Sequence, residues 1–131
     1  MDADEAGLDE AGLAVRRQVL GDAHVDAAIA HTDPFTADFQ RFVTRYAWGG
    51  IWTRDGLDRR TRSVVTLAVL ATLRAEEELA MHVRAALRNG LTADEVKEVL
   101  LQVAIYAGVP AANAAFAVAQ RTLSEHDDPP A

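Results

Sequence analysis

The chain has 131 residues and a formal net charge of −7, with 13 basic residues against 20 acidic ones. This length predicts a single domain over residues 1–131, and the acidic balance argues against a nucleic-acid partner. The absence of cysteine excludes disulfides, thiol catalysis and zinc–thiolate sites. We see no signal peptide and no apolar run long enough to span a membrane, so we expect a cytoplasmic protein without a membrane partner.

The first third of the chain predicts three helices. Residues 4–20 have a weakly amphipathic pattern, and residues 23–31 predict a short second helix. Thr32-Asp33-Pro34 is a typical helix start, and a third helix is predicted from about Pro34 to Trp48. Aromatic and aliphatic residues recur on one face of this third helix, namely Phe35, Phe39, Phe42, Val43 and Tyr46.

The rest of the chain predicts four more helices. Asp58 is a candidate N-cap for a helix to about Arg74, and the next helix covers roughly residues 75–89. Thr92 and Glu95 have the spacing of a capping box. The helix that this capping box begins ends at Gly108, and a last helix runs from Pro110 to about Ser124. We expect disorder at about residues 1–6 and 126–131.

These elements define an all-α fold of six or seven helices, built around a central helical hairpin. The helix after Asp58 and the second half of the helix after Thr92 are apolar on every face. A single small domain has few places to bury both helices completely. The pattern therefore predicts a homo-oligomer.

A cluster of arginines lies in residues 41–62, which hold six arginines against two aspartates. A local basic segment in an acidic protein predicts binding of a small anion. The alternative is that these arginines pair with acidic helices on the surface.

Glu78 and His82 are the main candidates for chemistry. Their spacing of four residues places them together on one margin of a helix, where Glu78 can accept a hydrogen bond and fix the tautomer of His82. The alternatives are a structural histidine and an ordinary surface contact. A metal site is less favoured because no second ligand cluster is evident, and Lys97, the only lysine, is badly placed for Schiff-base chemistry. We therefore expect no metal and no cofactor.

Three segments carry a resemblance to a known family. They are residues 15–28 (VRRQVLGDAHVDAA), residues 35–73 with the loop WGGIWTR, and residues 78–116 with the turns NGLT and YAGVPAAN. The chain resembles the carboxymuconolactone decarboxylase family, of the alkylhydroperoxidase-like superfamily. Thiol-dependent members of that superfamily have a CxxC motif whose cysteines would fall on Ala75 and Glu78. Their peroxidase chemistry is therefore excluded in this chain.

The resemblance implies a reaction and an assembly. The implied reaction is cofactor-independent decarboxylation of 4-carboxymuconolactone, a small dianionic lactone, to β-ketoadipate enol-lactone in protocatechuate breakdown. The implied assembly is a trimer or hexamer, with a functional link to an enol-lactone hydrolase. Three alternatives stay open: a decarboxylase or isomerase of another anionic lactone, a non-catalytic oligomeric binding protein of the same fold, and metal-dependent hydrolysis through Glu78 and His82.

For this reaction we assign His82, oriented by Glu78, as the donor of a hydrogen bond or a proton. Arg62 is the first candidate for binding a substrate carboxylate. The further candidates for the substrate pocket are two arginines that would bind carboxylates and two tryptophans that would exclude water, namely Arg45, Arg54, Trp48 and Trp52.

Overall fold

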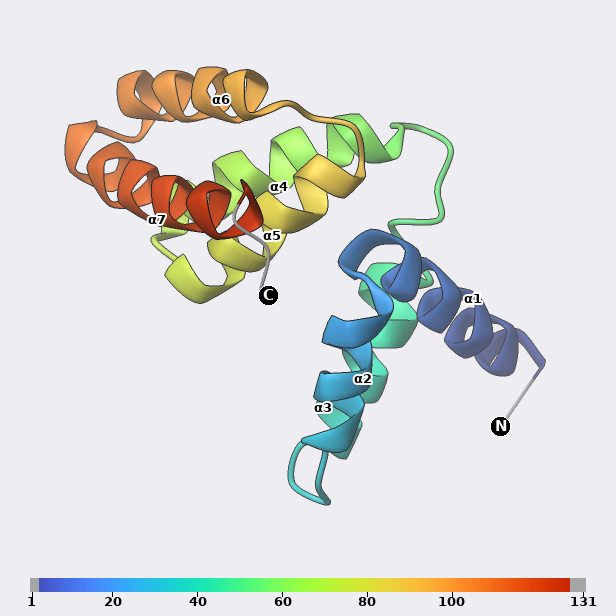
Figure 1. Ribbon diagram of the computed structural model, residues 1–131. Helices are drawn as coiled ribbons and strands as arrows, with labels where there is room; N and C mark the ends of the chain where they lie inside the picture. Colours follow the sequence, from blue (N-terminus) through green and yellow to red (C-terminus); the bar gives the residue numbers. More distant parts are fainter. Residues whose placement is uncertain (1–2, 128–131) are drawn as a thin grey trace. The chain divides into compact units, whose positions relative to one another are not determined.

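The computed structural model describes residues 3–127, and every regular element within them is a helix (Figure 1). Seven α-helices and one short π-helix confirm the all-α prediction and the predicted number of helices. The chain divides into two compact units, which we call unit 1 (residues 1–57) and unit 2 (residues 58–131). The predicted disorder of residues 1–2 and 128–131 falls outside the described residues, and none of the described helices is long and apolar enough to cross a membrane.

Unit 1 contains α1 (Ala3–Leu20), α2 (Asp22–Ala30), α3 (Ala37–Phe42) and the π-helix η1 (Val43–Trp48). The single helix predicted up to Trp48 is therefore wrong in its second half, where the backbone changes to i→i+5 hydrogen bonds. The amide of Gly49 donates to the carbonyl of Thr44 at 2.9 Å, and the amide of Trp52 donates to that of Ala47 at 3.0 Å.

Glycine allows α1 and η1 to pack closely in unit 1. A side chain at Gly12 would collide with the carbonyl oxygen of Thr44, and one at Gly49 would collide with the carbonyl oxygens of Leu8 and Arg45. The apolar face predicted around Phe35 does not pack inward in the single chain. Phe35 is 94% exposed, and the other aromatic residues of this face are at least half exposed.

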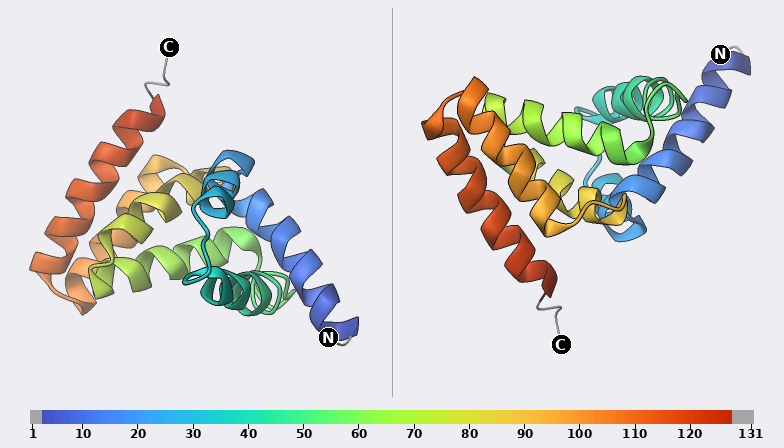
Figure 2. Two further views of the ribbon diagram at one scale, coloured as in Figure 1. Left: turned by 90° about the horizontal axis from the view of Figure 1, so that it is seen from below. Right: turned by 90° about the horizontal axis from the view of Figure 1, so that it is seen from above.

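Unit 2 contains α4 (Arg59–Leu73), α5 (Glu76–Arg88), α6 (Ala93–Tyr106) and α7 (Val109–Asp127). The four helices pack side by side, with α4 and α5 forming the predicted hairpin (Figures 1 and 2). Asp58 caps α4 by accepting a hydrogen bond from the Thr61 amide at 2.7 Å, and Thr92 with Glu95 forms the predicted capping box. Gly90 has a φ of 99° after α5, as a C-terminal glycine requires.

The core of unit 2 is aliphatic, and its fully buried side chains include Leu67, Leu79, Val83 and Leu100. In the single chain α4 is not buried on every face, because Val69 and other apolar residues of its outer side are about half exposed or more. The outer side of α6 is exposed as well. The exposed apolar residues on these outer sides are Val65, Val69 and Leu73 of α4 and Leu101 and Ile105 of α6.

Candidate active site

His82 lies on the inner face of α5 in unit 2. Its spacing to Leu79, Val83 and Ala86 places it on the stripe that packs against the core, and it is only 8% exposed. The ring atom Nδ1 is shielded from solvent. Glu78 lies one turn earlier on the same helix but is exposed. The two residues of the predicted pair thus differ in burial, with the imidazole buried and the carboxylate at the surface, and a contact between them stays a prediction.

Arg62 lies in the first turn of α4, where it is partly buried and its Nε atom is shielded. The neighbouring buried Ser63 accepts a hydrogen bond from the side-chain amide of Asn89 at 2.8 Å, which fixes the start of α4 beside the end of α5. His82 is seven residues before Asn89, so it lies roughly 10 Å further along the hairpin axis.

In unit 1, Arg45 makes a two-pronged ion pair with Asp9. Its Nε lies 2.8 Å from Oδ1 of Asp9, and its terminal nitrogen lies 2.9 Å from Oδ2. The hydrogen bond to Arg45 is the main reason that the pKa of Asp9 is lowered, and the positive charges of Arg45 and Arg41 add to it. This pair gives Arg45 a structural role in holding η1 to α1. Binding of a substrate carboxylate by Arg45 stays a prediction.

Trp48 and Trp52 pack against each other in unit 1, with ring centroids 5.1 Å apart and ring planes inclined by 31°. Both are buried. The turn after η1 is closed by Thr53, whose hydroxyl donates to the carbonyl of Gly49 at 2.7 Å. Arg54 follows and is exposed. The two tryptophans thus form a buried aromatic pair, and their effect on water at the substrate stays a prediction.

The seven predicted site residues therefore fall into two sets. Arg62, Glu78 and His82 belong to unit 2, whereas both tryptophans, Arg45 and Arg54 belong to unit 1. Among the described residues, no group of three histidine, aspartate or glutamate side chains could hold a metal ion.

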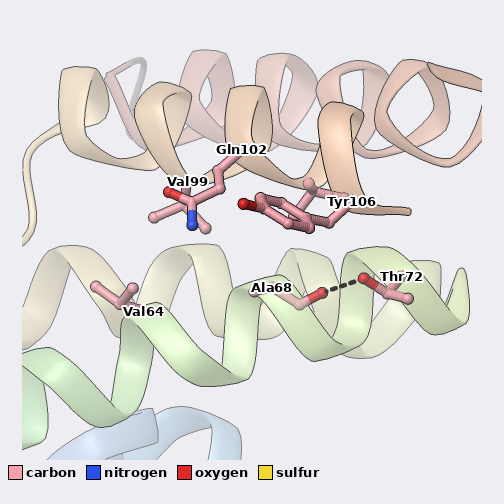
Figure 3. Close-up of a pocket in the computed structure, with 7 residues that line it drawn as sticks. Val64, Ala68, Thr72, Val99, Gln102 and Tyr106 are labelled. Carbon is pink, nitrogen blue, oxygen red and sulfur yellow. Dashed lines mark hydrogen bonds between the residues drawn. The ribbon is translucent and has the colours of Figure 1, made fainter. Parts of the chain in front are cut away.

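A groove between α4 and α6 is separate from these candidates (Figure 3). It has a volume of about 280 Å³ and a mostly aliphatic lining, with Gln102 and Tyr106 as polar exceptions. The hydroxyl of Thr72 donates to the carbonyl of Ala68 at 2.8 Å and is therefore occupied within the helix. None of the predicted catalytic residues lines this groove.

Sequence reasoning missed one residue, Arg16 of α1. It is buried and lies in a cavity of unit 1. The available signal was its position: Gly12, Val15, Arg16 and Val19 have the spacing of an inward helical stripe, and all four are buried. A charged residue within such a stripe indicates a special role.

A family model matches this chain, and several known proteins are similar to it. The model, described as the carboxymuconolactone decarboxylase family, matches residues 37–121. A 4-carboxymuconolactone decarboxylase from Acinetobacter baylyi is 49% identical over 114 residues, which cover 87% of this chain and 85% of that protein. The nitrosuccinic acid decarboxylase npaB from Metarhizium robertsii is 40% identical over 121 residues, covering 92% and 85%. A 4-carboxymuconolactone decarboxylase from Pseudomonas putida is 48% identical over 46 residues, covering 35% and 96%.

Proposed function

The chain belongs to the carboxymuconolactone decarboxylase family, and from this premise we propose that it converts 4-carboxymuconolactone to β-ketoadipate enol-lactone with loss of carbon dioxide. The observation that carries the proposal is the 49% identity to a 4-carboxymuconolactone decarboxylase over 87% of this chain. The shorter match to the protein from Pseudomonas putida agrees with it. The protein is thus a carboxy-lyase.

The chemistry of the substrate explains how this reaction proceeds without a cofactor. When the bond between the ring and its carboxylate breaks, carbon dioxide leaves and the electron pair moves into the conjugated lactone carbonyl. A dienolate forms, and a proton is then added to carbon. A hydrogen-bond donor at the dienolate oxygen is worth about 3–4 kcal/mol in comparable enzymes, because the negative charge develops there.

We assign His82 as the group that supplies this hydrogen bond or the proton to carbon. An imidazole can donate a hydrogen bond or a proton to a reacting group, and general acid catalysis contributes roughly 10²–10⁴-fold. Glu78, one turn away, is a positioning residue that would orient the ring. Its carboxylate lies in the first turn of α5, where the helix dipole favours a negative charge.

The carboxylates of the substrate need cationic partners, and Arg62 is the first candidate because it is partly buried in the first turn of α4 and its Nε atom is shielded from solvent. Arg54 is the second. Arg45 is already paired with Asp9, so we expect it to support the site by holding η1 in place. For the buried tryptophans Trp48 and Trp52 of unit 1, the exclusion of water from the substrate stays a prediction from the sequence.

Replacement of Arg62 tests its assignment. We expect Arg62→Ala to raise KM for the lactone or lower kcat by at least about tenfold, because a charge-assisted hydrogen bond is worth about 1.5–3 kcal/mol. Arg59→Ala, in the same turn of α4, is the matched control and should stay close to wild type. If Arg62→Ala leaves both constants near wild type, the assignment is wrong.

A second candidate reaction is decarboxylation of nitrosuccinate. It is favoured by the 40% identity to a nitrosuccinic acid decarboxylase over 92% of this chain. Both names describe loss of carbon dioxide from a small dicarboxylate. A nitro group can accept the electron pair as a lactone carbonyl does, so the same residues could serve either substrate.

The experiment that tests the function compares these two substrates on the purified wild-type protein. Lactone turnover is followed by ultraviolet absorbance, with carbon dioxide measured in both arms. We expect kcat/KM to be higher for 4-carboxymuconolactone. Faster turnover of nitrosuccinate would select the second candidate, and no turnover above the uncatalysed rate would favour a non-catalytic binding protein. Full activity after treatment with a chelator would remove metal-dependent hydrolysis.

The assembly, the cytoplasmic location and the link to an enol-lactone hydrolase are also proposals. A homo-oligomer, a trimer or hexamer, is supported by the exposed apolar outer sides of α4 and α6, such as Val69 and Ile105. Light scattering on the purified protein should give a mass that is a multiple of three chains. A monomer in solution would contradict this assembly.

A further inference from the structure

A buried arginine of unit 1 has no acidic partner in the part of the chain that the structure describes. Arg16 of α1 is only 8% exposed. Its two terminal nitrogens donate to neutral oxygens, to Oγ1 of Thr44 at 3.2 Å and to Oε1 of Gln40 at 3.1 Å. Its Nε atom is buried and has no hydrogen-bond partner among the described residues. The cation is therefore held by polar groups that do not neutralise it.

The next residue, Arg17, shows the usual arrangement. Its guanidinium forms ion pairs with Asp22 at 3.1 Å and Asp26 at 2.9 Å, and its side chain is 32% exposed. The two adjacent arginines of α1 thus differ in both respects: Arg17 is partly exposed and paired with acids, and Arg16 is buried and contacts only neutral groups.

A buried charge of this kind is costly. Burial lowers the pKa of Arg16, because it removes water from the charged form. An arginine nevertheless stays protonated in a protein. An isolated charge in the interior therefore needs a partner, and here it must come from outside the described side chains.

The cavity beside Arg16 has room for such a partner. Its volume is about 500 Å³, and its lining includes Asp9, Gln40, Arg41 and Thr44 together with Arg16. Both carboxylate oxygens of Asp9 accept hydrogen bonds from Arg45, and among the described residues no ion pair joins Asp9 to Arg16. Arg41 adds a second positive charge to the lining.

The hydrogen bonds of Arg16 also determine which hydrogen-bond donors of its two neighbours remain available. The Thr44 hydroxyl accepts from Arg16 and keeps its own proton for another acceptor. The Gln40 side chain accepts through its carbonyl, so its amide nitrogen remains a donor. The cavity thus combines a guanidinium with two neutral donors, and a group that only accepts hydrogen bonds fits it best.

We propose that this cavity of unit 1 binds a small carboxylate anion, with Arg16 as the anchoring cation and Thr44 and Gln40 as further donors. The planar guanidinium matches a carboxylate in geometry and charge. Anion binding at Arg16 does not depend on the proposed function. Only the identification of the anion as a carboxylate of the substrate rests on it.

Succinate is a suitable probe because it is small, dianionic and stable. Its binding to the purified full chain is measured by isothermal titration calorimetry at low ionic strength, where electrostatic binding is least screened. We expect wild type to bind it, and we expect Arg16→Gln and Arg16→Met to bind at least about tenfold more weakly. Arg17→Gln is the matched control and should bind like wild type.

Thr44→Val keeps the shape of the side chain and removes one hydrogen-bond donor. It replaces the Arg16 variants in the binding experiment if circular dichroism shows that those variants are unfolded. It should weaken binding by several-fold, since a neutral hydrogen bond is worth about 1 kcal/mol. Absence of succinate binding to wild type at millimolar concentrations would overturn the proposal. Equal affinity in wild type and the folded Arg16 and Thr44 variants would overturn it as well.

Turnover measurements then show whether the bound anion is a carboxylate of the substrate or a separate small carboxylate. If succinate competes with the lactone and Arg16→Gln raises KM, the site binds a carboxylate of the substrate. If succinate binds without affecting turnover, the site serves a separate anion. Both results support an anion site. If wild type binds succinate but does not decarboxylate the lactone, the proposed function fails while the anion site stands.

Discussion

Unit 2 packs four long helices around aliphatic side chains, whereas unit 1 packs one long helix and three short ones with close glycine contacts and an arginine ion pair. In unit 2, Leu67, Leu79 and Leu100 are fully buried in one cluster. In unit 1, α1 meets η1 at Gly12 and is tied to it by the ion pair of Asp9 with Arg45. Aliphatic packing is non-directional, while close glycine contacts and paired charges each require one geometry. The two units should therefore respond differently to substitution.

The largest effect is expected in the core of unit 2. Leu100→Ala leaves a cavity among closely packed aliphatic side chains and should lower the free energy of unfolding by about 2–5 kcal/mol. Urea unfolding followed by circular dichroism measures this change. Lys97→Ala, one turn earlier on the exposed side of α6, should stay within about 0.5 kcal/mol of wild type. Similar losses in both variants would mean that unit 2 does not depend on its aliphatic cluster.

A smaller effect is expected where α1 meets η1. Gly12→Ala places a methyl group against the carbonyl of Thr44, so the backbones must separate, at a cost of about 1–3 kcal/mol. Gly7→Ala is the matched control, since nothing lies within 4 Å of the added carbon and alanine favours the helix. Thermal unfolding should therefore show Gly12→Ala melting below wild type and Gly7→Ala at or above it. Equal melting temperatures of the two variants would contradict the claim that unit 1 depends on a close glycine contact between α1 and η1.

The smallest effect is expected from the ion pair of unit 1, and it is measured as the stability that is lost when the pH falls into the acid range. Arg45 lowers the pKa of Asp9 in the folded state below its ordinary value of 3.8. The stabilisation is therefore fully present above that ordinary value and is lost as the pH falls through the lowered one. Wild type should lose more stability than Arg45→Gln when the pH falls below about 4. Parallel curves of melting temperature against pH for the two proteins would contradict this role of the pair.

Sequence patterns predicted unit 2 better than unit 1, for a physical reason. Helix caps are local, so Asp58 and Thr92 with Glu95 were correctly identified from neighbouring residues alone. The change to a π-helix at Val43 depends on how η1 packs against α1, and no short pattern contains that information. The exposure of Phe35 was missed because periodicity shows that a face is apolar and not whether it is covered.

For the candidate site too, the sequence predicted the local spacing of residues but not their burial or their distant partners. The spacing of Glu78 and His82 placed them on one helix, but their unequal burial depends on the packing of α5 against other helices. The pairing of Arg45 with Asp9 joins residues 36 positions apart, which a linear pattern does not reveal. Arg16 could have been found, because a charge within an inward stripe is visible in the sequence.

The most direct test of the central claim is the initial rate of 4-carboxymuconolactone decarboxylation by wild type and by His82→Ala. The account predicts a loss in kcat of at least about 100-fold in the variant, the low end for a general acid. His31→Ala, which replaces an exposed histidine of unit 1, should retain the wild-type rate. A folded His82→Ala protein that turns over the lactone at the wild-type rate would contradict the account and place the proton donor elsewhere.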